Sequence, residues 1–215
     1  MNIVQSGLFM EKVGQGLQFN VYSNRNKVIK KSTSKIQRAS KLIKWTPGLL
    51  LKPIKLMNEI NKSVLIGKNS IDNIRKSGID LELLANPIFN KNEIQQDKVE
   101  ILSDYLRRDF EKSKIWIDKF IELMVECWKN GFSERVFNLT INNGVDKEGR
   151  VVLIDLGELT FEKKEVRNAI KIKRWEKSWS FNCDMNKEVK EYYKKQMRER
   201  LTLHNLNKYW NLNKR

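Results

Sequence analysis

The stretch Val151–Gly157 reads VVLIDLG, and it decides the fold and the site that the rest of the chain is expected to form. Its four leading apolar residues predict a buried β-strand. The strand leads to Asp155, whose carboxylate can hold Mg²⁺ against phosphate groups, because Mg²⁺ takes hard oxygen ligands and usually keeps only one or two protein carboxylates. Gly157 then lets the chain turn sharply. The stretch therefore predicts a metal-binding turn.

A β-hairpin pattern lies near the N-terminus. Residues 8–31 alternate between apolar and polar positions around Gly14 and Gly16, and they predict three strands. Val21 falls in the second of these strands. Lys30 ends the third.

The remaining pattern predicts an α+β fold, because strands come first and helices follow. The expected elements are a basic amphipathic segment (32–45), a helix (53–66), a short helix (70–76), two strands (83–89 and 98–102), a hinge (103–105), a helix (109–128), a second hairpin around residues 146–149, and charged helices after residue 155. The order favours two lobes, an N-lobe over residues 1–104 and a C-lobe over residues 105–215.

Together these parts resemble a protein kinase. Gly14 and Gly16 match the first two glycines of the kinase glycine-rich loop, and Phe19 occupies the place of the third. The resemblance covers roughly residues 8–160. It implies a two-lobed protein-kinase-like fold, with a β-rich N-lobe, a short helical C-lobe, and ATP with Mg²⁺ between them. About sixty residues follow Asp155, so the chain is similar to compact bacterial kinase-like proteins and small phosphotransferases.

The resemblance also implies roles in nucleotide binding. Lys30 is expected to contact the α- and β-phosphates and to act in catalysis. Its expected acidic partner is Glu59 in the helix over 53–66, with Glu82 as the fallback. The residues implied to bind the nucleotide are Gly14, Gly16, Val21, Lys30, Glu59, Leu102 and Asp104.

Kinases place a metal-binding Asn about a dozen residues before the metal-binding Asp. Asn143 and Asp155 meet this spacing and are the implied Mg²⁺ ligands. Asn142 takes the place of Asn143 if the hairpin is one residue longer.

One position departs from the kinase pattern. Asn138 stands where kinases place the catalytic Asp, and Val136 and Phe137 replace the His and Arg before it. A neutral amide can orient a hydroxyl group but cannot accept its proton. The chain is then a natural pseudokinase, an atypical kinase that uses another carboxylate such as Glu134, or an engineered inactive variant.

The composition is that of a soluble globular protein with a strongly basic surface. The 215 residues carry a formal net charge of +16, so a polyanion such as nucleic acid is a plausible partner. No apolar run approaches the roughly 20 residues that cross a bilayer, so we expect a cytoplasmic protein with no membrane partner. The expected function is ATP- and Mg²⁺-dependent transfer of a γ-phosphoryl group to a hydroxyl acceptor. The alternatives are a nucleotide-binding pseudokinase that acts as a regulatory module and a basic nucleic-acid-binding protein.

Overall fold

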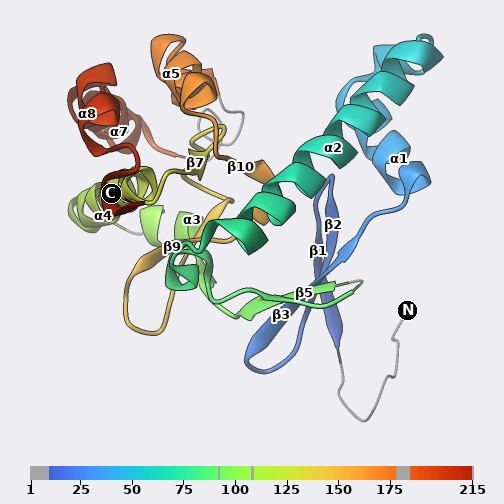
Figure 1. Cartoon of the computed structure of the whole chain (residues 1–215), viewed down its shortest axis with the longest axis horizontal. Helices are drawn as coiled ribbons and strands as arrows, with labels where there is room; N and C mark the ends of the chain where they lie inside the picture. The colour runs from blue at the N-terminus through green and yellow to red at the C-terminus, as the bar shows by residue number, and fades with distance from the viewer. Residues whose placement is uncertain (1–9, 92, 108, 178–184, 215) are drawn as a thin grey trace.

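The computed structural model describes residues 10–91, 93–107, 109–177 and 185–214. A five-stranded antiparallel sheet in the N-terminal region is followed by a mostly helical region, so the expected α+β class is confirmed. Figure 1 shows the long helix α2 (Pro53–Ser77) running from one end of the molecule toward the C-terminal region. This arrangement is compatible with two lobes.

The sheet is built around the predicted N-terminal hairpin. Its strands, in spatial order, are β1 (Glu11–Gln15), β2 (Phe19–Ser23), β3 (Lys27–Ser32), β5 (Glu93–Asp97) and β4 (Ile88–Phe89). The three strands predicted over residues 8–31 are confirmed from residue 10 onward, and residues 8 and 9 lie outside the described chain. In the central strand, Lys30 pairs with Val21 on one side and Ile94 on the other.

Two helices follow the third strand and pack on each other. The first, α1 (Lys35–Trp45), begins after the N-cap Ser34, whose hydroxyl accepts the Gln37 backbone N–H in a capping box. A short 3₁₀ turn, η1 (Pro47–Leu49), leads into α2. The basic segment that the sequence predicted over 32–45 is therefore mostly helical.

Helix α2 is continuous where the sequence predicted a break between residues 66 and 70. Gly67 does not end the helix because it lies on the buried face, where a Cβ would come within 2.6 Å of the Gln18 amide oxygen. On the same face Ser70 donates its hydroxyl to the backbone of the 3₁₀ turn η3 (Leu156–Glu158). A stripe of small residues thus lets α2 lie close to the segment predicted to bind metal.

The strand predicted over 83–89 is mostly absent. Its first half is a 3₁₀ turn, η2 (Leu81–Leu84), which leaves only β4 extended. Ala85 and Asn86 then adopt left-handed φ angles of 54° and 49°, which end the turn and redirect the chain.

The predicted hinge also differs. The strand expected over 98–102 is reduced to β6 (Glu100–Ile101), and the residues expected in the hinge, 103–105, belong to the short helix α3 (Leu102–Leu106). The segment that joins the sheet to the helical region is therefore the stretch before α3.

The C-terminal region packs around α4 (Phe110–Lys129), which confirms the helix predicted over 109–128 and begins after the N-cap Asp109. The second predicted hairpin is confirmed as β8 (Asn143–Val145) and β9 (Val151–Leu153), which form a sheet with β6. The remaining elements are β7 (Ser133–Glu134), β10 (Leu159–Thr160), α5 (Lys163–Lys171), η4 (Arg174–Lys177), α7 (Lys187–Arg200), α8 (Leu203–Tyr209) and η5 (Leu212–Lys214). No helix in the described ranges has both the length and the apolar character that crossing a bilayer requires.

Candidate functional site

A cavity of about 1180 Å³ lies between the N-terminal sheet and the residues that flank the hairpin β8–β9. Its walls come from three parts of the chain: the first three strands, the stretch 96–101 that joins the two regions, and the residues around Asp155. The residues that the sequence singled out and that line it include Gly14, Gly16, Val21, Lys30, Asn142 and Asp155. Residues that are distant in sequence thus meet around one space.

Lys30 is the buried cation of this cavity. Its side chain is only 8% exposed, and its ammonium group donates a hydrogen bond to the backbone carbonyl of Ile154. Burial lowers the pKa of Lys30 to about 8, and the negative charge of Asp155 counteracts part of that shift. A buried ammonium with one carbonyl partner favours the approach of an anion.

Asp155 is placed by the hairpin and by the turn that follows it. The backbone N–H groups of Ile154 and Asp155 both donate to the carbonyl of Asn142, at 2.8 and 3.4 Å. The Asp155 carboxylate accepts the Gly157 N–H at 3.1 Å, which caps η3. Among the described residues, no other hydrogen bond or ion pair engages this carboxylate, so it can take further ligands at the cavity wall.

Gln18 joins the glycine-containing hairpin to the turn after Asp155. Its side chain lies between Gly67 of α2 and Gly157, and its amide nitrogen donates to the Gly157 carbonyl at 3.3 Å. Its amide oxygen is buried with no hydrogen-bond partner in the described part of the chain. Both glycines are needed for this packing, because a Cβ on Gly157 would lie 1.6 Å from that oxygen.

This packing predicts a specific pair of mutational effects. Gly157→Ala alone is expected to lower the free energy of unfolding by about 2 kcal/mol, because the added methyl group overlaps the buried Gln18 amide. Adding Gln18→Ala to Gly157→Ala should recover part of the loss, so the two effects are not additive. Denaturant unfolding of both single variants and the double variant measures this coupling. Additive effects would contradict the contact between Gly157 and Gln18. Gly149→Ala is a separate control: a Cβ there meets no atom within 4 Å, but the φ of 73° is strained, so this variant measures the cost of backbone strain without a steric clash.

Glu134 holds the loop that contains Asn138 in place. One carboxylate oxygen of Glu134 accepts the Asn138 backbone N–H and the Asn142 amide, each at 2.7 Å. Phe137 has a left-handed φ of 52°, and the Tyr193 hydroxyl donates to its carbonyl at 3.1 Å. A strained residue held in place by buried neighbours is typical of functional loops.

Asn138 itself faces its own loop. Its side-chain oxygen accepts the backbone N–H and the hydroxyl of Thr140, at 3.3 and 3.0 Å. It is not among the residues that line the cavity.

The two candidate amide ligands are held differently. Asn142 lines the cavity, and its amide nitrogen is bound to Glu134. Asn143 is fully buried, and its amide nitrogen donates to the Asn138 carbonyl at 2.7 Å. The Asn143 side-chain oxygen is buried with no hydrogen-bond partner among the described residues. An unpaired buried acceptor costs free energy, which marks Asn143 as a candidate ligand, but Asn143 does not line the cavity, whereas Asn142 does.

Two carboxylates near the cavity have raised pKa values. Burial raises the pKa of Glu134 to about 7, but Glu134 is fully buried and does not line the cavity, so its role there is structural. Burial, followed by the charge of Asp155, raises the pKa of Glu158 to about 7. Glu158 does line the cavity, and no hydrogen bond or ion pair engages its carboxylate in the described chain, although the charges of Arg135 and Arg174 counteract part of the shift. The sequence analysis missed Glu158; its position directly after VVLIDLG was the available signal.

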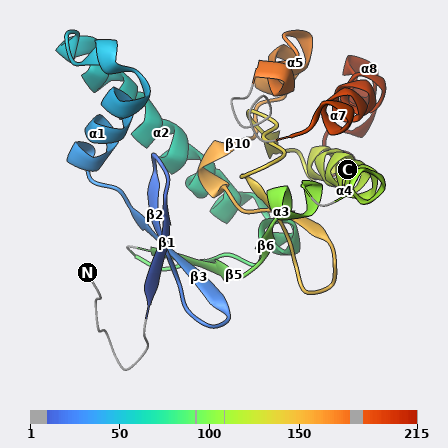
Figure 2. The ribbon, with the colours of Figure 1, turned by 180° about the vertical axis from the view of Figure 1, so that it is seen from behind.

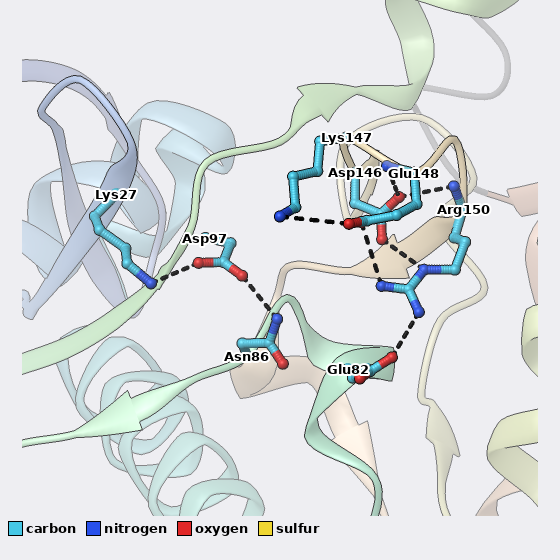
Figure 3. Close-up of polar contacts among 8 residues, drawn as sticks. All are labelled: Lys27, Glu82, Asn86, Asp97, Asp146, Lys147, Glu148 and Arg150. Atoms are coloured by element: carbon cyan, nitrogen blue, oxygen red, sulfur yellow. Dashed lines mark hydrogen bonds and ion pairs between the residues drawn. The ribbon is translucent and has the colours of Figure 1, made fainter.

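The structure does not bring the expected acidic partner to Lys30. Glu59 lies near the start of α2, about two turns before Gly67, and forms no ion pair within the described chain. Glu82 instead pairs with Arg150, whose guanidinium also binds Asp146 (Figure 3). The sequence prediction of a Lys30 partner on α2 is therefore not met.

The two expected hinge contacts also lie outside the cavity. Leu102 is buried in the core, and Asp104 is an exposed residue of α3 that lies 3.9 Å from Arg107. Asp97 lines the cavity in their place, and it binds Lys27 and Asn86 at the edge of the sheet (Figure 3). Both hydrogen bonds lower the pKa of Asp97.

Comparison with known proteins gives no family assignment. No family model matches the chain, and no curated protein matches its sequence.

Proposed function

We propose that the chain is a phosphotransferase that binds ATP in the cavity and moves its γ-phosphoryl group to a hydroxyl acceptor. The observation that carries the proposal is the position of Lys30 opposite Asp155, beneath a hairpin with Gly14 and Gly16. A buried lysine attracts phosphate oxygens, and backbone N–H groups next to glycines can approach them closely. The sheet and the stretch 96–101 supply apolar walls for a planar base, including Val21 and Val99.

The residues also suit a Mg²⁺ ion. Asp155 offers a carboxylate, and the Asn143 side-chain oxygen is a buried acceptor that lacks a partner among the described residues. No cluster of three or more His, Cys, Asp or Glu side chains that could hold a metal occurs in the described ranges. Mg²⁺ suits such a sparse set, because it completes its shell with water and substrate phosphates. When bound, the ion neutralises charge that develops on the phosphates.

Proton acceptance is the step for which Asn138 is unsuited. Glu158 is the carboxylate that can replace it, because it lines the cavity next to Asp155 and has a pKa of about 7. Above that pH Glu158 is ionised and can take the proton of an acceptor hydroxyl. Lys30 holds the phosphates in place. Glu134 holds the loop by hydrogen bonds to Asn138 and Asn142 and does not take part in proton transfer.

The test of this assignment is the Glu158→Gln variant. We expect it to lower the turnover of γ-labelled ATP by about 10²-fold, the usual scale for a positioned general base. Wild-type turnover should rise as the pH increases through about 7, because Glu158 loses its proton there, and the variant should lose this rise. Labelled product and label transferred to the chain itself are measured together.

Glu162→Gln is the matched control, because Glu162 is an exposed acid four residues further along. Equal turnover and an unchanged pH profile in Glu158→Gln would rule out Glu158 as the base. The Asn138→Asp variant tests whether position 138, rather than Glu158, is the place of the proton acceptor. A large gain in turnover would show that it is.

The second candidate function is a nucleotide-binding pseudokinase. The side-chain oxygen of Asn138 is already occupied by Thr140, which favours a structural role for this residue. Mg²⁺-dependent ATP binding with no turnover in either the wild type or Asn138→Asp would support this function over transfer.

A further inference from the structure

We propose that the turn between α1 and α2 docks onto an anionic lipid surface. Four large apolar side chains project there, and we call them the apolar tip: Trp45, Leu50, Leu51 and Ile54. Leu51 is 84% exposed, Ile54 78% and Leu50 66%, so they cover almost nothing in the described chain. Large apolar side chains gathered on one part of a surface mark an interaction site.

The fold carries the apolar tip away from the rest of the molecule. The buried residues Gly67 and Ser70 hold the second half of α2 against η3 and Gln18, whereas its first half packs with α1. Figures 1 and 2 show this helical pair extending beyond the sheet and away from the C-terminal helices. The tip therefore forms the end of a projection, a shape that suits contact with an extended flat surface.

Cations surround the apolar tip. Residues 12–58 contain no Asp or Glu. The lysines that flank the tip are Lys41, Lys44, Lys52 and Lys55. Within the described chain none of these four forms an ion pair, although Lys41 lies 5.4 Å from the centre of the Trp45 ring. Burial, together with the like charges of Lys12 and Lys44, lowers the pKa of Lys41. The tip is therefore a concentration of positive charge, and the acid that follows it in the sequence, Glu59, forms no ion pair in the described chain.

This combination matches the two layers of an anionic membrane surface. Apolar side chains enter the boundary of the acyl chains, lysines meet anionic headgroups, and a tryptophan such as Trp45 suits the level between them. The centres of protein interfaces are depleted of lysine. Nucleic acid would pair with the lysines but leave Leu50 and Leu51 in water. The proposal departs from our expectation of no membrane partner, which was based on the lack of a long apolar run in the sequence; contact with a membrane surface does not require such a run.

Sedimentation with sucrose-loaded vesicles tests the proposal on the full chain. We expect binding to phosphatidylcholine vesicles that contain phosphatidylserine, weak binding to phosphatidylcholine alone, and a decrease as salt is added. The double variant Leu50→Ser/Leu51→Ser should reduce partitioning by at least about tenfold, because both side chains lose their apolar contact with lipid. These side chains are exposed, so thermal unfolding of the variant should match the wild type.

Ile115→Ser is the matched control, because Ile115 is 55% exposed on α4 in the C-terminal region. Equal loss of binding in both variants would overturn the proposal. Binding that depends on salt but not on the tip would also overturn it, and would indicate a charge-only partner such as nucleic acid. A dimer in solution that Leu50→Ser/Leu51→Ser dissociates would show instead that a second copy of the chain covers the tip.

Discussion

Replacing Lys30 with methionine is expected to stabilise the folded protein. Burial lowers the pKa of Lys30 from its ordinary value of 10.5 to about 8, so the charged lysine costs the folded state about 3 kcal/mol at pH 7. Methionine removes this cost but leaves the Ile154 carbonyl without its donor, which costs about 1 kcal/mol. We expect a net gain of about 2 kcal/mol in the free energy of unfolding.

The pH dependence of this gain gives the sharper check. The unfolded chain holds the Lys30 proton more tightly than the folded chain, so wild-type stability rises between pH 8 and about 10.5. The advantage of methionine is therefore complete below pH 8 and shrinks above it. Denaturant unfolding at pH 7 and pH 10 measures the difference, with Lys27→Met on the same strand as the control. An advantage of equal size at both pH values would contradict the buried charge.

Lys30→Met should also weaken ATP binding by at least about tenfold and leave adenosine binding unchanged, because only the phosphates lose a partner. Calorimetry with the two ligands measures the ratio. Equal losses for ATP and adenosine would show that Lys30 supports the fold of the cavity rather than the phosphates.

Asp155→Ala is expected to remove the Mg²⁺ dependence of ATP binding. The carboxylate is the anionic ligand that we assign to the metal, so its loss should weaken Mg·ATP binding on the order of 100-fold, while the binding of ATP without metal changes little. Because one hydrogen bond, to Gly157, holds this side chain in the described structure, the fold should persist. Calorimetric titrations with and without Mg²⁺ provide the measurement.

Asp104→Ala is the control for this prediction. The sequence placed Asp104 in the nucleotide site, whereas the structure places it on the exposed side of α3. It should bind Mg·ATP as the wild type does. Unchanged Mg·ATP affinity in Asp155→Ala would contradict a metal site at Asp155. Weaker Mg·ATP binding in Asp104→Ala would support the predicted contact between Asp104 and the nucleotide.

Local patterns predicted the parts of the fold that local patterns determine. The alternation over residues 8–31, the N-cap Asp109 and the turn at 146–149 each specify an element through nearby residues, and each element forms. Lys30 and Asp155 were found from local strand patterns, although Lys30 does not end its strand as predicted, because β3 continues to Ser32. Their meeting at one cavity followed only from the resemblance, since nothing local specifies a contact over such a separation.

The misses have tertiary causes. Glu59 was chosen because it lies mid-helix in a predicted 53–66 helix, but the true α2 continues to Ser77 and places Gly67 and Ser70 nearest the site. Glu158 was overlooked because its one local signal, its position directly after VVLIDLG, does not separate it from the other acids of a charged region. Only the cavity and the shifted pKa distinguish it.

A crystal structure with a non-hydrolysable ATP analogue and Mn²⁺, whose anomalous scattering locates the metal, tests the central claim most directly. The account predicts the triphosphate between the Gly14–Gly16 turn and Lys30, and the metal at roughly 2 Å from oxygens of Asn143 and Asp155. Nucleotide bound elsewhere, or a cavity that takes no nucleotide at millimolar concentration, would contradict it.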